Sequence, residues 1–133
     1  MATTTAQLIL TSTDLLSDSL SVSAIATLTT AGSSTGLTGT EGLGRKKTAN
    51  TSEYTLFAAA DATDDKAHKI YLKNMSTTAA EYFEVQVAGV VVGRLYAGDW
   101  AFIPWMANAS TNDIKIDPSA NSMVLEYMLF TDE

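Results

Sequence analysis

The chain has 133 residues, enough for one domain with a substantial core, and it contains no cysteine, which excludes disulfides, thiolate chemistry and cysteine-bound metals. Its net charge of −7 argues against the chain as a whole gripping nucleic-acid phosphates, and no run of about 18 apolar residues predicts a membrane span. Charged residues make up only 17%, against roughly 25% in ordinary soluble domains, so we expect a partner or further copies to cover part of the surface.

An N-terminal arm or leading edge segment is expected over residues 1–18. Within it a short apolar group, Leu8, Ile9 and Leu10, interrupts a polar stretch. This pattern fits an edge strand or an arm that reaches a neighbouring subunit. The residues that follow, 13–18, predict a turn or a single helical turn capped by Thr13 or Asp14.

The main domain is expected to span residues 19–133. At its start, residues 19–29 alternate between apolar and polar side chains. This period of two, together with the β-branched residues, favours a strand over a helix.

A long loop rich in glycine, serine and threonine is predicted over residues 31–44. Three of the eight basic residues follow it directly: Arg45, Lys46 and Lys47. They form either a solvated part of the loop or an electrostatic anchor for an acidic neighbour. The glycine spacing superficially resembles a phosphate-binding loop, but that motif needs lysine directly after its last glycine, where this chain has Arg45.

The middle of the chain predicts a β-hairpin whose turn contains the Ala-Gly pair at 88–89. A two-residue loop would bring Arg94 onto the apolar face. A three-residue loop pairs Phe83 with Leu95 and Glu84 with Arg94, so it buries only apolar groups and joins opposite charges. We therefore predict the three-residue loop.

Five further strands are predicted from alternating side chains, at 54–59, 69–73, 100–105, 113–117 and 123–129. Pro104 cannot donate to a strand ladder, so its strand should end there or lie at a sheet edge. Eight or nine short strands with turns between them, and no convincing helix, predict an all-β fold. We expect a single antiparallel β-sandwich with a jelly-roll-like arrangement.

Trp100 and Trp105 fall on opposite faces of one predicted strand. Either ring could lie in the core with the other on the surface, or both could pack inside the sandwich. An exposed tryptophan would be a candidate contact anchor, because aromatic side chains dominate interface energetics. The full set of interface candidates is Leu8, Ile9, Leu10, Arg45, Lys46, Lys47, Trp100 and Trp105.

No catalytic, cofactor-binding or metal site is predicted. His68 is the single histidine and follows Asp61, Asp64 and Asp65, but these residues lack the regular spacing of a calcium loop. The chain has no G-x-S-x-G motif, and one histidine alone could serve as a base. We therefore expect neither an enzyme nor a cofactor.

Several segments taken together resemble a known group of proteins. They are KIYLKN, VGRLYAGDWAFIPW, DIKI and VLEYMLF, preceded by STDLLSDSLSVS and GLGRKKT. This order resembles small all-β virion proteins of tailed bacteriophages, in particular those of marine and cyanobacterial phages. The resemblance covers most of the chain, as a pattern of strands and turns.

The resemblance implies a structural role in the phage particle, in first place as a capsid decoration or cement protein that binds and stabilises the assembled head. The implied partners are the major capsid protein or other virion proteins and further copies of the chain, with a trimer favoured. Nucleic acid and membranes are not expected as partners. The implied location is the virion, on the capsid surface, after synthesis in the host cytoplasm.

Two other functions stay open at this point. A tail, adaptor or fibre component of the virion would share the same sandwich. A carbohydrate-binding β-sandwich module, with Trp100 or Trp105 as the stacking platform, belongs to a different class.

Overall fold

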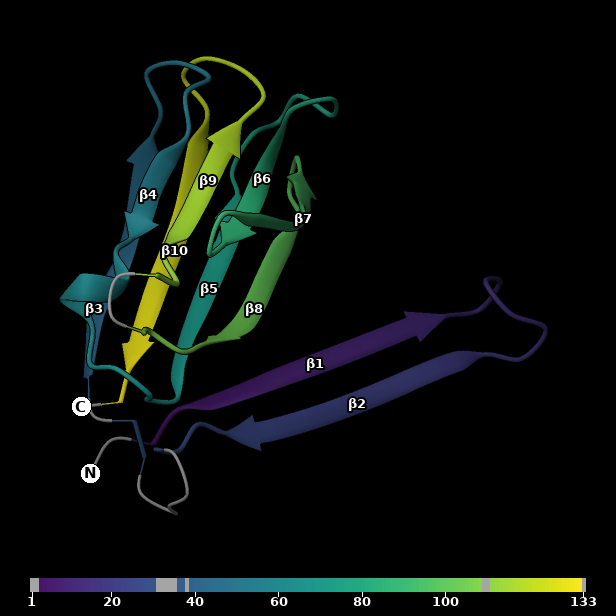
Figure 1. Ribbon diagram of the computed structural model, residues 1–133. Helices are drawn as coiled ribbons and strands as arrows, with labels where there is room; N and C mark the ends of the chain where they lie inside the picture. Colours follow the sequence, from purple (N-terminus) through teal and green to yellow (C-terminus); the bar gives the residue numbers. More distant parts are fainter. Residues whose placement is uncertain (1–2, 31–35, 38, 109–110, 133) are drawn as a thin grey trace.

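The computed structural model describes residues 3–30, 36–37, 39–108 and 111–132. These residues form ten strands and one short 3₁₀ helix, arranged in three antiparallel sheets (Figure 1). The elements are β1 (Thr5–Ser12), β2 (Leu20–Thr27), β3 (Gly39–Lys47), β4 (Tyr54–Phe57), η1 (Ala59–Asp61), β5 (His68–Asn74), β6 (Tyr82–Val87), β7 (Val90–Tyr96), β8 (Trp100–Trp105), β9 (Ile114–Pro118) and β10 (Val124–Thr131).

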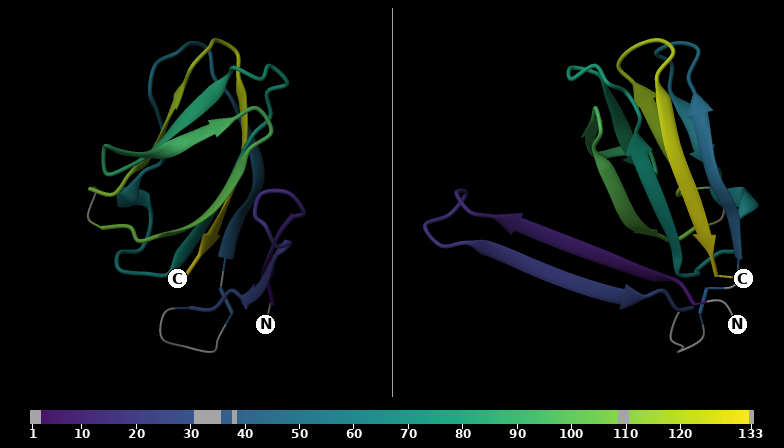
Figure 2. Two further views of the ribbon diagram at one scale, coloured as in Figure 1. Left: turned by 90° about the vertical axis from the view of Figure 1, so that its right-hand side faces the viewer. Right: turned by 180° about the vertical axis from the view of Figure 1, so that it is seen from behind.

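Eight of the strands form a β-sandwich, which confirms the predicted fold class. One sheet has the order β3-β10-β5-β8 and the other the order β4-β9-β6-β7. The two sheets face each other as two layers, seen most clearly from behind in Figure 2. Side chains of both sheets fill the space between them, as expected when each sheet buries one face.

The core is built by the predicted period of two. In β5 the side chains of Ile70 and Leu72 are fully buried, while Lys69, Tyr71 and Lys73 alternate with them and reach the other face. Each fully buried aliphatic or aromatic side chain contributes about 1.5–3 kcal/mol. The buried cluster comprises Phe57, Ala59, Ile70, Leu72, Phe83, Val85, Leu95, Trp105, Ala107, Ile114, Ile116, Met123, Leu125 and Leu129.

The β6–β7 hairpin combines both registers that the sequence allows. Phe83 pairs with Leu95 and Glu84 with Arg94, as predicted. Near the turn, however, Val87 pairs with Val90, so the loop has two residues rather than three. A bulge between the two regions absorbs the difference of one residue, since a bulge places two residues opposite one.

The second part of the glycine-rich segment, predicted as a loop over residues 31–44, belongs to a strand instead. Residues 39–47 form β3, an edge strand paired with β10, and Arg45, Lys46 and Lys47 therefore stand on a strand. Gly44 explains part of this, because a Cβ atom there would lie 2.9 Å from Cζ of Tyr127. Glycine lets the Tyr127 ring pack directly against the β3 backbone. Residues 31–35 and 38 of the predicted loop lie outside the described residues.

β8 is the edge strand of its sheet, with Pro104 near its end, in agreement with the edge position expected for a strand that contains proline.

The N-terminal region forms a separate two-stranded sheet. β1 pairs with β2 over eight residues, from Thr5 opposite Thr27 to Ser12 opposite Leu20. The expected boundary at residue 18 therefore falls in the turn of this hairpin, and the sandwich begins with β3 rather than with residue 19. Alternation identified β2 as a strand, but alternation does not say which strand it pairs with.

The turn of this β1–β2 hairpin is not helical. Ser12 Oγ accepts hydrogen bonds from the backbone N–H of Asp14 and Leu15, so Ser12 takes the capping place expected of Thr13 or Asp14. The hairpin leaves the sandwich at the end where the C-terminus lies, and it splays outward from there (Figures 1 and 2).

Candidate interaction surface

The β1–β2 hairpin has one wholly apolar face along most of its length. Residues directly opposite in an antiparallel pair share a face, so the register places Leu8 beside Ala24 and Leu10 beside Val22. The complete apolar hairpin face consists of Ala6, Leu8, Leu10, Leu20, Val22, Ala24 and Ala26. The opposite face is mainly serine and threonine, with Ile9 and Ile25 among them.

Neither face of the hairpin is covered along its length. Leu10 is 46% exposed and Val22 41% on the apolar hairpin face, and Ile9 and Ile25 are exposed still further on the other. The two strands contain no charged residue; Asp14 and Asp18 in the turn are the hairpin's charges. A two-stranded hairpin is marginal in water without a surface to pack on. These features fit an element that is completed by contact with another surface.

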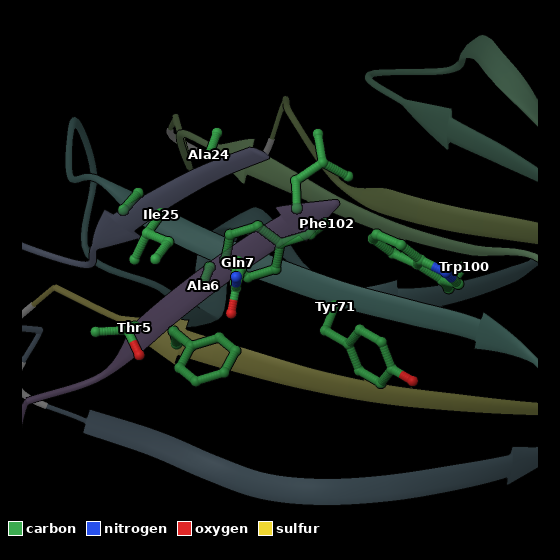
Figure 3. Close-up of a pocket in the computed structure, with 11 residues that line it drawn as sticks. Thr5, Ala6, Gln7, Ala24, Ile25, Tyr71, Trp100 and Phe102 are labelled. Carbon is green, nitrogen blue, oxygen red and sulfur yellow. The ribbon is translucent and has the colours of Figure 1, made fainter. Parts of the chain in front are cut away.

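A groove of about 490 Å³ lies between the base of the hairpin and the outer face of the sheet that contains β5, β8 and β10. Figure 3 shows Thr5, Gln7 and Ile25 on the hairpin side and the rings of Tyr71, Trp100 and Phe102 on the sheet side. The complete lining is Thr5, Ala6, Gln7, Leu8, Ala24, Ile25, Ala26, Tyr71, Trp100, Phe102 and Phe130.

The sheet side of the groove is an aromatic stripe, which we define as Tyr71, Trp100, Phe102 and Phe130. Tyr71 and Phe102 are cross-strand partners on β5 and β8. The rings of Phe102 and Phe130 pack edge to face, with their centroids 6.1 Å apart. Trp100 is 53% exposed. The other three rings are partly buried. Aromatic rings grouped in this way at a surface mark a contact surface more often than an ordinary solvated one.

Basic residues border the aromatic stripe on the same outer face. The register aligns Arg45, Glu126, Lys73 and Trp100 in one row across four strands. Lys69 and Lys47 stand on the same face, at its two ends. This basic border of Arg45, Lys47, Lys69 and Lys73 holds four of the eight basic residues of a chain whose net charge is −7. The sheet therefore presents a locally positive face.

A hydrogen-bond network anchors the border to the stripe. Arg45 donates to Oε2 of Glu126 at 3.0 Å, and the Tyr71 hydroxyl donates to Oε1 of the same carboxylate at 3.2 Å. Partial burial, and then the hydrogen bond to Glu126 and its charge, raise the pKa of Tyr71 above its ordinary value of 10.0. The ring is held in its place by a carboxylate that is itself largely buried.

The structure brings together only some of the residues singled out from the sequence. Leu8 and Trp100 both line the groove, while Ile9 and Leu10 continue along the hairpin. Arg45 and Lys47 belong to the basic border. Lys46 points differently, with its ammonium 5.2 Å from the centre of the Tyr54 ring.

Trp105 is not part of this surface. It is only 4% exposed, its indole N–H donates to the carbonyl of Asn112 at 2.7 Å, and it packs beside Phe57 and His68. Of the three alternatives left open for the tryptophans, the structure shows Trp100 as the surface ring and Trp105 as the core ring. The alternation of β8 places the two rings on opposite faces but cannot tell which face is covered.

His68 is a structural residue of the core. It is 1% exposed, its Nδ1 accepts the backbone N–H of Asp132, and its Nε2 lies 2.9 Å from the carbonyl of Thr63, to which it donates. These two bonds define a neutral ring with its proton on Nε2. In the part of the chain that the structure describes, no three His, Asp or Glu side chains gather closely enough to hold a metal ion.

Among the described residues, no helix is long and apolar enough to cross a membrane.

Sequence reasoning missed Tyr71, Phe102 and Phe130 as surface residues. Tyr71 alternates with the buried Ile70 and Leu72, and Phe130 follows the buried Leu129. Phe102 shares their outward face as the cross-strand partner of Tyr71. An aromatic residue at an outward position on each of three strands was a readable signal. It became a surface only when the strand order placed β8, β5 and β10 side by side.

Comparisons with protein-family models, with curated proteins and with solved structures find no match to this chain.

Proposed function

We propose that the chain is a structural virion protein of a tailed phage, and that it serves as a capsid decoration or cement protein on the assembled head. The observation that carries this proposal is the β1–β2 hairpin, whose two strands carry no charge, whose apolar face is uncovered, and which stands away from the sandwich (Figure 1). A decoration protein needs a stable body and an extension that grips neighbours. The sandwich supplies the first and the hairpin supplies the second.

The strand pairing supports the jelly-roll form of the sandwich that we propose here. The strands pair as nested partners: β3 with β10, β4 with β9, β5 with β8, and β6 with β7. Such nesting is what a long hairpin gives when it is rolled into two sheets of four strands. Double-sheet jelly rolls occur in viral capsid and lectin domains, so the fold is compatible with the role without fixing it.

The proposed mechanism is stabilisation by preferential binding. The hairpin and the basic border would contact the major capsid protein and neighbouring copies, with a trimer as the favoured assembly. A protein that binds the assembled lattice but not its dissociated subunits stabilises the lattice by mass action. The chain would then be located on the capsid surface of the virion.

The test uses heads of the phage that encodes the chain, prepared without this protein. Adding the purified protein should give stoichiometric binding to the heads and raise the temperature at which they release DNA. A Leu8→Ser/Leu10→Ser variant should bind at least about tenfold more weakly, because it places hydroxyls on the apolar hairpin face.

The control is Val90→Ser/Val92→Ser, which changes two valines on β7 of the other sheet that are exposed still further than Leu8 and Leu10. It should bind heads as the unmodified protein does. Heads that gain no heat resistance and bind no protein would overturn the proposal. Labelled protein found on tails instead would assign it to a tail, adaptor or fibre position.

A carbohydrate-binding module is a second candidate, favoured by the exposed Trp100 ring beside the groove. Sugars stack on such rings, but they also need several polar partners, and the groove lining is mainly aliphatic and aromatic. A glycan array should therefore show no binding. Specific binding that a Trp100→Ala variant loses would favour the module instead.

A further inference from the structure

We propose that the groove is a receptor for the hairpin of a second copy of this chain, so that copies are joined by hairpins laid across the aromatic stripe of their neighbours. This inference deepens the proposed function, because it names the surface on which the hairpin docks. It concerns the isolated protein and can be tested without a phage particle.

The hairpin and the groove are complementary in shape. The apolar hairpin face carries small side chains at Ala6, Ala24 and Ala26, whereas the aromatic stripe presents bulky rings. Small residues against rings allow two layers to pack closely. The groove of about 490 Å³ is space that one chain leaves open between the base of its own hairpin and its own sheet (Figure 3).

The charges are complementary as well. The hairpin carries its two negative charges at the turn, on Asp14 and Asp18, whereas the receiving sheet carries the basic border. Copies with a net charge of −7 repel one another in general. Contact between an uncharged pair of strands with an acidic tip and a locally positive sheet avoids that repulsion. A second copy supplies both parts of this contact, the uncharged strands and the acidic tip.

The direction of the hairpin fits the position of the charges. In one chain, the base of the hairpin and Phe130 line the groove together with Leu8 and Trp100, and the hairpin leaves across the β8 edge of the sheet (Figure 1). The hairpin of a second copy that enters across the same edge runs the opposite way, from β8 towards β3. Its acidic tip would pass the row of Lys73 and Arg45 towards Lys47.

The first part of the test is the molar mass of the purified protein by light scattering on a sizing column. We expect a closed oligomer of two or more copies, which dissociates on dilution. The hairpin variant Leu8→Ser/Leu10→Ser should run as a monomer with an unchanged sandwich circular dichroism spectrum. The control Val90→Ser/Val92→Ser should keep the mass of the unmodified oligomer.

The second part exchanges the charges. Lys47→Glu/Lys73→Glu should weaken association by roughly tenfold at low salt, because it sets acidic groups against the acidic tip. Adding Asp14→Lys/Asp18→Lys to the same chain should restore the affinity, since every copy then carries a basic tip and an acidic border. Rescue of this kind separates a broken contact from a damaged fold.

A monomeric unmodified protein would overturn the inference, as would an oligomer that is insensitive to the hairpin changes or a charge exchange without rescue. A monomer that nevertheless binds and stabilises heads would leave the proposed function standing while removing this inference. An oligomer that is joined through the hairpin but does not bind heads would leave this inference standing while removing the proposed function.

Discussion

The strands of the sandwich and those of the hairpin alternate with the same period of two, which gives each strand one apolar face. Only the sandwich buries these apolar faces. Ile70, Leu72 and Phe83 in the sandwich are completely buried. Leu10 and Val22 lie on the apolar hairpin face, at corresponding positions of their strands, and remain nearly half exposed. The comparison teaches that alternation defines an apolar face but not what will cover it. In the sandwich the second sheet covers it, and for the hairpin we propose another copy of the chain.

The largest expected difference between the two regions concerns single apolar side chains. Phe83→Ala should lower the free energy of unfolding by about 3–5 kcal/mol, because it opens a cavity in the centre of the core. Ile9→Ala on the hairpin should change it by no more than about 0.5 kcal/mol, because that side chain is 60% exposed. Chemical denaturation measures both. Equal losses would show that the hairpin folds as part of the sandwich core.

Changes of polar residues should also destabilise the protein more in the sandwich than in the hairpin. Asn74 is fully buried, and its amide donates to the carbonyls of Glu81 and Leu95 while its Oδ1 accepts the N–H of Ser76. Asn74→Ala should lower the free energy of unfolding by about 1–3 kcal/mol, because it leaves these backbone groups without hydrogen-bond partners.

The matched hairpin change is Ser12→Ala, which removes the acceptor for two exposed backbone N–H groups in the turn. Water can replace that acceptor, so global stability should stay within about 0.5 kcal/mol of the unmodified protein. Thermal unfolding of the two variants side by side checks the pair. A larger loss from Ser12→Ala than from Asn74→Ala would contradict the comparison.

A smaller effect than at Phe83 or Asn74 is expected at Tyr71, which lies on the boundary between the regions. Tyr71→Phe removes the hydrogen bond to Glu126 and should cost about 0.5–1.5 kcal/mol at neutral pH. Because the pKa of Tyr71 is raised in the folded protein, its contribution is complete below the unfolded value of about 10 and is lost as pH rises through the folded value.

Urea unfolding between pH 8 and pH 11 tests this dependence. The stability difference between the unmodified protein and Tyr71→Phe should shrink at the alkaline end. The other tyrosines are present in both proteins and so drop out of the difference. A gap that widens with pH would mean that the sign of the pKa shift is wrong.

The sequence was sufficient for most of the strands and for the fold class, because alternation and turn residues are local signals. The pairs Phe83–Leu95 and Glu84–Arg94 followed from asking which register buries only apolar groups. The bulge beside them did not, since it depends on a two-residue turn with positive φ at Ala88 and Gly89 competing with the register of the strand ends.

Local sequence patterns could not predict which strands pair with one another. The partner of β2 could not be read from its alternation, and β3 was missed because glycine content suggested a loop. Its glycine at position 44 is instead required by the Tyr127 ring of a strand more than eighty residues away. The candidate surface was predicted in pieces, at Leu8 to Leu10, Arg45, Lys47 and Trp100. The aromatic residues between these pieces became visible only with the sheet order.

The most direct test of the central claim is amide hydrogen exchange of the purified protein at two concentrations, one above and one below the point at which it dissociates. We expect the amides of β5, β6 and β10 to be equally protected at both concentrations, and those of β1 and β2 to be protected only in the oligomer. Hairpin amides that are as protected in the monomer as those of the sandwich would contradict the claim that the hairpin is completed by another copy.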